Sequence, residues 1–120
     1  MGIAHHSNHL VWFEAARTDL CRDAGLTYRE IEQRGVILVV TEVGCNYRGP
    51  FHYDDEVIIE TFISRAASRS LVFSYELRKE GEKAIRADGF TRHIWLDAKT
   101  RAPIVAPPDV MELFRPYVRS

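Results

Sequence analysis

The stretch Leu71-Val72-Phe73-Ser74-Tyr75-Glu76-Leu77-Arg78-Lys79 carries the clearest pattern in this chain. From Leu71 to Leu77 every second residue is large and apolar, whereas Ser74, Glu76 and Arg78 between or after them are polar. Successive side chains of a strand point to opposite faces of a sheet. The two-residue period therefore predicts a β-strand with one buried face.

Three further strands are predicted around this one. Segments rich in β-branched residues predict strands over Val36–Arg48 and Glu56–Ser64, and Ala84–Asp97 predicts a last long strand. Gly49-Pro50 and Glu80-Gly81-Glu82 are typical of the breaks between them. The period in the first strand places six residues on one face: Ile37, Val39, Thr41, Val43, Cys45 and Tyr47. The sheet is expected to end before three prolines, which cannot donate to a ladder: Pro103, Pro107 and Pro108.

A long helix is predicted before the strands. Either Ser7 or Asn8 can cap its start, and Gly25 suits a left-handed residue just past its end. Its apolar residues recur every three or four positions: Leu10, Phe13, Ala16, Leu20 and Ala24.

Two short helices complete the pattern. Thr27 and Glu30 have capping-box spacing for a helix that Gly35 ends, and Asp109 is expected to cap a final helix around Val110 and Phe114. The order predicts one α+β domain over residues 1–120, with a helix against one face of an antiparallel sheet. One helix covers only part of such a sheet, so we expect self-association to bury the rest.

Composition narrows the class of protein. The chain has 120 residues, 46% hydrophobic and 28% charged, with a net charge of −1 and scattered cations. It therefore lacks the basic stripe of a nucleic-acid-binding protein. The apolar run from Val36 to Val40 is too short to span a bilayer, and no secretory signal is visible. Cys21 and Cys45 form no disulfide framework, so a cytoplasmic protein with reduced thiols is expected.

Four segments carry a family pattern. Met1–Arg17 (MGIAHHSNHLVWFEAAR) is similar to Asp-x-x-Gly, two small apolar residues, x-His-x-Asn-Tyr, and a Trp/Tyr-Phe-Glu helix that carries an Arg. The later segments are Tyr47-Arg48-Gly49-Pro50 with Tyr53-Asp54-Asp55, Arg69-Ser70-Leu71-Val72-Phe73, and Ala87-Asp88-Gly89-Phe90-Thr91-Arg92-His93-Ile94. The four segments span nearly the whole chain. In this order they resemble the motifs of the 4-hydroxybenzoyl-CoA thioesterase family.

The resemblance implies a hotdog fold, in which a curved antiparallel sheet wraps a long helix. Such domains join sheets edge to edge in homodimers, which often pair into homotetramers, and the active site lies at the dimer interface near the start of the long helix. The implied reaction hydrolyses an acyl-CoA with a short-chain, hydroxylated or aromatic acyl group to a free acid and CoA. No metal and no bound cofactor are expected, and neither nucleic acid nor a membrane is an expected partner.

The catalytic Asp of the family is missing from this sequence. It precedes the motif glycine by three residues, and because that glycine is Gly2, its position falls before Met1. The family's first strand would also precede Met1. We expect a true start upstream; the alternative is a protein that has lost this carboxylate.

The start of the long helix supplies the first expected catalytic group. The opening amides of a helix have no internal partners and carry the positive end of its dipole. The resemblance implies that the His6 backbone N–H faces the thioester oxygen, and that Asn8 holds the loop and caps the helix. The imidazoles of His5, His6 and His9 are expected to be loop or cap groups. Metal binding would need a further ligand that the sequence does not supply.

A second branch of hotdog thioesterases carries its carboxylate on the long helix, eight residues after the oxyanion amide, with a Thr four residues later. Counted from His6, these positions are Glu14 and Thr18, which share one helical face. The alternative for Glu14 is a structural role, as an ion pair with Arg17 or a hydrogen bond to the loop.

Further candidates lie on the strands and turns. Arg65 and Arg69, with Ser70, are candidates for binding the CoA phosphates, or else solvated surface charge. Thr91 and His93 either line the acyl pocket or pack under the helix. Cys21 and Cys45 lie away from a helix start, which argues against a cysteine nucleophile.

Two other functions stay open beside the thioesterase. A hotdog dehydratase would use a His with an acidic residue on the helix, a role that His6 and Glu14 could fill. A non-catalytic hotdog protein that binds acyl thioesters would explain the missing Asp.

Overall fold

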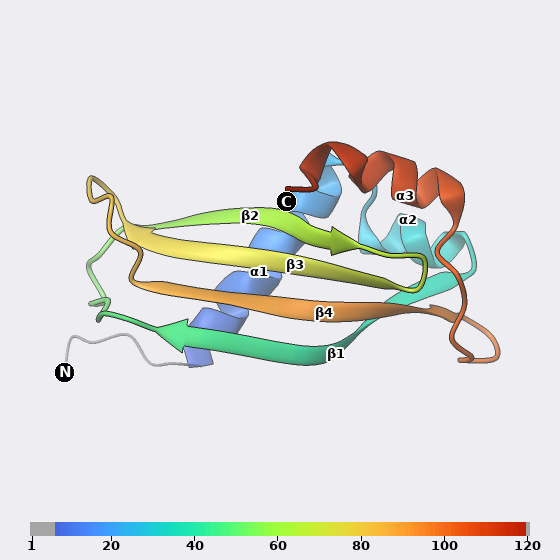
Figure 1. Cartoon of the computed structure of the whole chain (residues 1–120), viewed down its shortest axis with the longest axis horizontal. Coiled ribbons are helices and arrows are strands. Elements are labelled where there is room, and N and C mark those ends of the chain that lie inside the picture. The colour runs from blue at the N-terminus through green and yellow to red at the C-terminus, as the bar shows by residue number, and fades with distance from the viewer. Residues whose placement is uncertain (1–6, 120) are drawn as a thin grey trace.

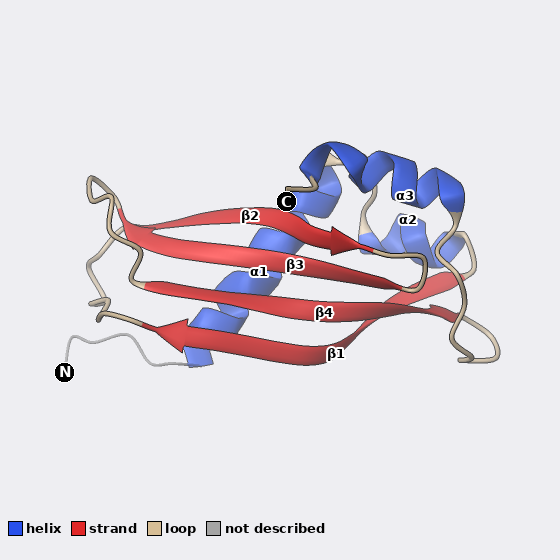
Figure 2. Cartoon of the chain, in the orientation of Figure 1, coloured by secondary structure: helices blue, strands red, loops and turns tan. Residues whose placement is uncertain are grey.

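The long predicted helix crosses one face of a four-stranded antiparallel sheet in the computed structural model, which describes residues 7–119 (Figure 1). Figure 2 shows the strands side by side with this helix behind them. The elements in chain order are α1 (Ser7–Asp23), α2 (Tyr28–Gln33), β1 (Val36–Tyr47), β2 (Val57–Ala66), β3 (Ser70–Lys79), β4 (Ala87–Asp97), α3 (Pro108–Phe114) and the 3₁₀ turn η1 (Arg115–Tyr117). The predicted α+β hotdog architecture is confirmed.

The strands lie in the order β1-β4-β3-β2, so β3 and β4 are central and β1 and β2 form the edges. Every pairing is antiparallel. The face toward α1 holds the sheet's part of the core, which includes Leu71, Phe73, Tyr75 and Leu77 of β3 and Ala87, Thr91, His93 and Trp95 of β4. The alternation in β3 thus predicts its buried face correctly.

Helix α1 approaches the sheet closely at one glycine. The Phe13 ring stacks on the Tyr75 ring at 4.3 Å between centroids. A Cβ atom at Gly89 would lie 2.6 Å from the Phe13 ring and 2.5 Å from the Gly44 carbonyl oxygen. Only a residue without a side chain lets Phe13 and Gly44 approach β4 this closely.

A β-bulge in β1 overturns the single face predicted for that strand. The pairing shifts register between Val40 and Glu42, which leaves Thr41 as the extra residue. Before the bulge, Leu38 and Val40 pair with the inward-facing Trp95 and His93; after it, Val43, Cys45 and Tyr47 pair with Thr91, Gly89 and Ala87. Ile37 and Val39 therefore belong to the opposite face from Val43.

Three of the predicted helix boundaries are confirmed: the two glycine ends and the capping box. Gly25 and Gly35 have φ of 91° and 84°, the left-handed values expected past a helix end. Thr27 and Glu30 form the reciprocal capping box before α2. Asp109 is not a cap: α3 begins at Pro108, so Asp109 lies inside the first turn, where it pairs with Arg34. In residues 7–119, no helix combines the length and apolar character needed to cross a membrane.

Candidate active site

The first turn of α1 is held by aromatic rings from two other segments. His9 is 1% exposed, and its ring lies 5.1 Å from the Trp12 ring, 5.8 Å from the Tyr47 ring and 6.1 Å from the Phe51 ring. Tyr47 ends β1, and Phe51 comes from the loop that follows. The His9 imidazole is therefore buried among aromatic rings of α1, β1 and the following loop.

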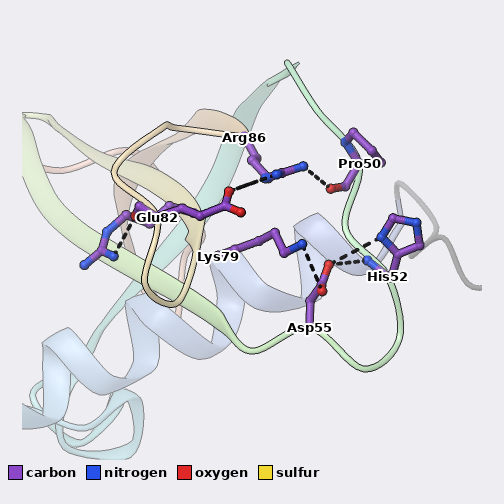
Figure 3. Close-up of polar contacts among 7 residues, drawn as sticks. Pro50, His52, Asp55, Lys79, Glu82 and Arg86 are labelled. Atoms are coloured by element: carbon purple, nitrogen blue, oxygen red, sulfur yellow. Dashed lines mark hydrogen bonds and ion pairs between the residues drawn. The ribbon is translucent and has the colours of Figure 1, made fainter.

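The loop between β1 and β2 is held by hydrogen bonds and an ion pair near its two ends (Figure 3). The Arg86 Nη1 atom donates to the Pro50 carbonyl at 2.9 Å. Its Nη2 and Nε atoms both donate to the same carboxylate oxygen of Glu82, at 2.8 and 3.1 Å. Asp55 accepts from the His52 backbone N–H at 2.6 Å and pairs with Lys79 at 3.3 Å. These contacts, the His52 bond first, lower the pKa of the Asp55 carboxyl. They hold Phe51 over the start of α1.

The predicted oxyanion donor lies just before the part of the chain that the structure describes. His6, whose backbone amide is the predicted oxyanion donor, lies outside the described residues, as does His5. Asn8 lies in the first turn of α1, which begins at Ser7. Ser7 and Asn8 therefore lie inside the helix and not at the cap position before it, so the cap predicted at one of them is wrong.

Glu14 and Thr18 lie together on the exposed side of α1. With Val11, Ala15 and Asp19 they line an open hollow of about 380 Å³. Glu14 forms no ion pair with Arg17 within residues 7–119, so the ion pair predicted as one structural alternative for this carboxylate is wrong. Arg17 is instead bound to groups on other elements.

Arg17 heads a chain of buried hydroxyl groups that sequence reasoning missed. Its Nε donates to the Tyr28 hydroxyl at 2.8 Å, and its Nη1 donates to the Tyr75 hydroxyl at 3.3 Å. The Tyr75 hydroxyl lies 2.7 Å from Thr91 Oγ1, which lies 2.9 Å from His93 Nε2. Thr91 and His93, predicted as either pocket or packing residues, are both buried under α1, and His93 also lines a pocket.

Burial sets the protonation of these groups. Loss of water lowers the pKa of His93 to about 3, and the charge of Arg17 acts in the same direction, so this imidazole is neutral. Burial raises the pKa of Tyr28 to about 12 and that of Cys21 to about 11. The thiol of Cys21 is therefore protonated and unreactive, which agrees with the argument against a cysteine nucleophile.

The predicted CoA-binding residues lie far from the start of α1 in the same protomer. Arg65 pairs with Val72 in the sheet register and Ser70 with Ile94, at the end of the sheet opposite Tyr47. Figure 1 shows this β2–β3 turn at the end away from the beginning of α1. Arg65 and Arg69 are exposed. One protomer therefore does not bring them to Glu14 and Thr18.

Comparison with known proteins supplies the family. The family model described as the thioesterase-like superfamily matches residues 1–114. YneP of Bacillus subtilis (strain 168), named as a candidate acyl-CoA thioesterase, is 34% identical over 105 residues, which cover 87% of this chain and 75% of YneP.

Two solved structures share the fold over nearly all of the chain. The hypothetical protein TT1821 from Thermus thermophilus superposes with a TM-score of 0.87 at 35% identity, covering 98% of this chain and 88% of that one. The DHNA-CoA thioesterase of Staphylococcus aureus superposes with a TM-score of 0.86 at 29% identity, covering 97% and 79%. With its helix-on-sheet fold and its match over residues 1–114, this chain belongs to the thioesterase-like superfamily.

Proposed function

We propose that this protein is an acyl-CoA thioesterase that uses Glu14 and Thr18 of α1. The observation that carries the proposal is the hollow that both residues line, about two turns after the helix begins. Membership of the thioesterase-like superfamily and the name of the Bacillus relative support the same reaction class.

The proposed mechanism is attack of water on the thioester carbonyl carbon. Glu14 takes a proton from the water as the new C–O bond forms, and Thr18, one turn later, orients that water. The amides at the start of α1, that of His6 first, stabilise the charge that develops on the carbonyl oxygen. The C–S bond then breaks, the CoA thiolate leaves and takes up a proton, and the acid is released.

A second copy of the chain completes the site in this proposal. Strand β1 is an edge strand with exposed apolar residues, and antiparallel pairing of two β1 strands builds a homodimer. Antiparallel pairing brings opposite ends of the two sheets together. It therefore moves the Arg65, Arg69 and Ser70 end of one copy toward the α1 start of the other, where these residues would meet CoA. Pairing of dimers into tetramers remains part of the proposal.

The acyl group is proposed from the sequence resemblance rather than from geometry. The motifs that resemble the 4-hydroxybenzoyl-CoA branch favour short-chain, hydroxylated or aromatic acyl groups. A cytoplasmic setting is also part of the proposal, and the two free cysteines, Cys21 and Cys45, support it because thiols stay reduced there.

The test is thiol release from acetyl-, medium-chain and aromatic acyl-CoAs by the wild-type chain and by Glu14→Gln. A general base contributes about 10²- to 10⁴-fold. We therefore expect Glu14→Gln to lower kcat/KM by about that factor. Asp23→Asn, which removes a charge from the far end of α1, should leave it unchanged.

Two results would contradict the proposal. Equal turnover by wild type and Glu14→Gln would exclude this carboxylate as the base. Absence of turnover in a folded oligomer that still binds CoA would indicate the alternative, a hotdog protein that binds acyl thioesters without hydrolysing them.

A further inference from the structure

The guanidinium of Arg17 is sheltered within the fold but has no carboxylate partner in the described part of the chain. Among residues 7–119, its hydrogen bonds go to two phenol oxygens, those of Tyr28 and Tyr75, and it takes part in no ion pair. These two bonds use two of its five N–H groups. Since a charge removed from water is costly unless it is paired, the remaining donors make Arg17 a ready partner for an anion.

A pocket of about 290 Å³ opens beside this guanidinium, between α1, α2 and β1. Arg17, Tyr28 and His93 contribute polar groups to its wall, and Ile31, Leu38 and Val40 contribute apolar ones. Glu32 also lines the pocket, but its side chain is exposed and makes no ion pair with Arg17. An apolar wall with a few convergent polar groups is the usual form of a small-molecule site.

His93, which also lines this pocket, has a ring nitrogen beneath the wall that is unpaired among the described residues. It is 1% exposed, and its Nδ1 is buried with no hydrogen-bond partner in residues 7–119. Since Arg17 can only donate, the Tyr75 hydroxyl accepts from it and directs its own proton to Thr91. Thr91 then donates to His93 Nε2, which assigns the imidazole proton to Nδ1. Arg17 thus brings a positive charge to the pocket wall, where the Tyr28 hydroxyl accepts from only one of its five N–H groups.

We propose that this Arg17 pocket binds a carboxylate carried on a short apolar body. The carboxylate would take the free N–H groups of Arg17, and the apolar body would lie against Ile31, Leu38 and Val40. This pocket is distinct from the hollow lined by Glu14 and Thr18, which lies on another side of α1.

The carboxylate has two sources. It is either the far end of an acyl group whose thioester is being hydrolysed, or a separate small acid. The first source rests on the proposed thioesterase activity. Val40 borders the Arg17 pocket and lies on the exposed edge of β1. In the proposed dimer, the active site of the second copy would therefore lie close to this pocket.

The first arm of the test measures binding without turnover. Benzoate and its neutral isostere benzamide are titrated by calorimetry at pH 7. Wild type should bind benzoate at least tenfold more tightly than benzamide, and Arg17→Gln should lose this preference. Arg22→Gln, an exposed arginine of the same helix that pairs only with Asp19, is the matched control and should keep it.

A second variant keeps the test decisive if Arg17→Gln does not fold. Val40→Trp leaves the hydrogen bonds of Arg17 in place and fills the mouth of the pocket, so it should also abolish benzoate binding. The proposed site would be overturned if wild type showed no preference for benzoate over benzamide. It would also be overturned if a folded Arg17→Gln or Val40→Trp protein kept that preference.

The second arm separates the two sources by comparing kcat/KM for succinyl-CoA and butyryl-CoA. If the site holds the acyl end, the succinyl-to-butyryl ratio should fall at least tenfold in Arg17→Gln. An unchanged ratio together with Arg17-dependent benzoate binding would assign the site to a separate small acid. No hydrolysis of either thioester would contradict the proposed function and leave the benzoate result standing.

Discussion

His93 is buried beneath α1, and no carboxylate of residues 7–119 lies beside it. The groups that face it are the Thr91 hydroxyl, the Phe73 ring at 5.2 Å and, through the hydroxyl chain, the positive charge of Arg17. Burial lowers its pKa to about 3, below the usual 6.5 of an unfolded chain. The unfolded state therefore binds more protons than the folded state between these pH values, and acid favours unfolding.

We expect wild-type stability to fall by about 2 kcal/mol between pH 7 and pH 5 through this histidine. The Asp55 and Asp97 carboxyls, whose pKa values lie below 3.8 in the folded state, lose their contribution only at lower pH. Urea unfolding at both pH values measures the effect. His93→Gln should show a smaller loss than wild type. Equal losses in wild type and His93→Gln would contradict the assignment.

At the same scale, the sequence did not reveal what Arg17 binds. Its spacing to Glu14 is compatible with a pair on a helix, and local spacing is all that a sequence offers. Its actual partner Tyr75 is 58 residues away in the chain. Only the packing of α1 over β3 brings the two together, so the Arg17 pocket could not be predicted from motifs.

At the scale of elements, the loop from residue 48 to residue 56 sets the position of the α1 start. It contributes Phe51, which is 1% exposed and packs edge-on against Trp12 at 5.7 Å. The Arg86 side chain connects this loop, through the Pro50 carbonyl, to Glu82 in the β3–β4 connection. Because charge-assisted bonds of this kind are stronger than neutral ones, Arg86 restrains the loop.

We expect Arg86→Gln to loosen this loop and to destabilise the protein by about 1–2 kcal/mol. Amide hydrogen exchange should quicken in residues 48–52, whose Arg48 and Gly49 N–H groups bond to the Arg86 carbonyl. The control is Arg115→Gln, which removes an exposed ion pair between Arg115 of η1 and Glu112 of α3. It should change neither the stability nor the exchange of the loop. Unchanged exchange in Arg86→Gln would show that the backbone bonds alone hold the loop.

Elements with a local cause were predictable. The capping box at Thr27, the glycine ends at Gly25 and Gly35 and the alternation in β3 follow from neighbours in sequence, and all are confirmed. The bulge at Thr41 was not, because a continuous run of residues that favour strands gives no sign of an extra residue. That residue exchanges the two faces of β1, so periodicity misassigned half of the strand.

At the scale of the whole molecule, the two sheet edges differ in how they are covered. The outer side of β2 receives the end of the described chain: Val118 pairs with Ile63, and the Arg119 guanidinium lies 4.4 Å from the centre of the Phe62 ring. Edge β1 has no such cover within residues 7–119, and Val40, Val43 and Tyr47 on it are 45%, 47% and 40% exposed. An open edge with apolar side chains favours pairing with another strand.

We therefore expect Val43→Lys to convert the proposed dimer into a monomer, because it places a charge on the apolar β1 edge and so opposes pairing with another strand. Sedimentation equilibrium measures the mass. Val105→Lys, at a residue 53% exposed outside the sheet, is the control and should remain a dimer. If the site needs both copies, Val43→Lys should also lose thioesterase activity while keeping its fold. A folded, monomeric and fully active Val43→Lys protein would show instead that one protomer holds the complete site, and the positions of Arg65 and Arg69 would then argue against any role for them in binding CoA.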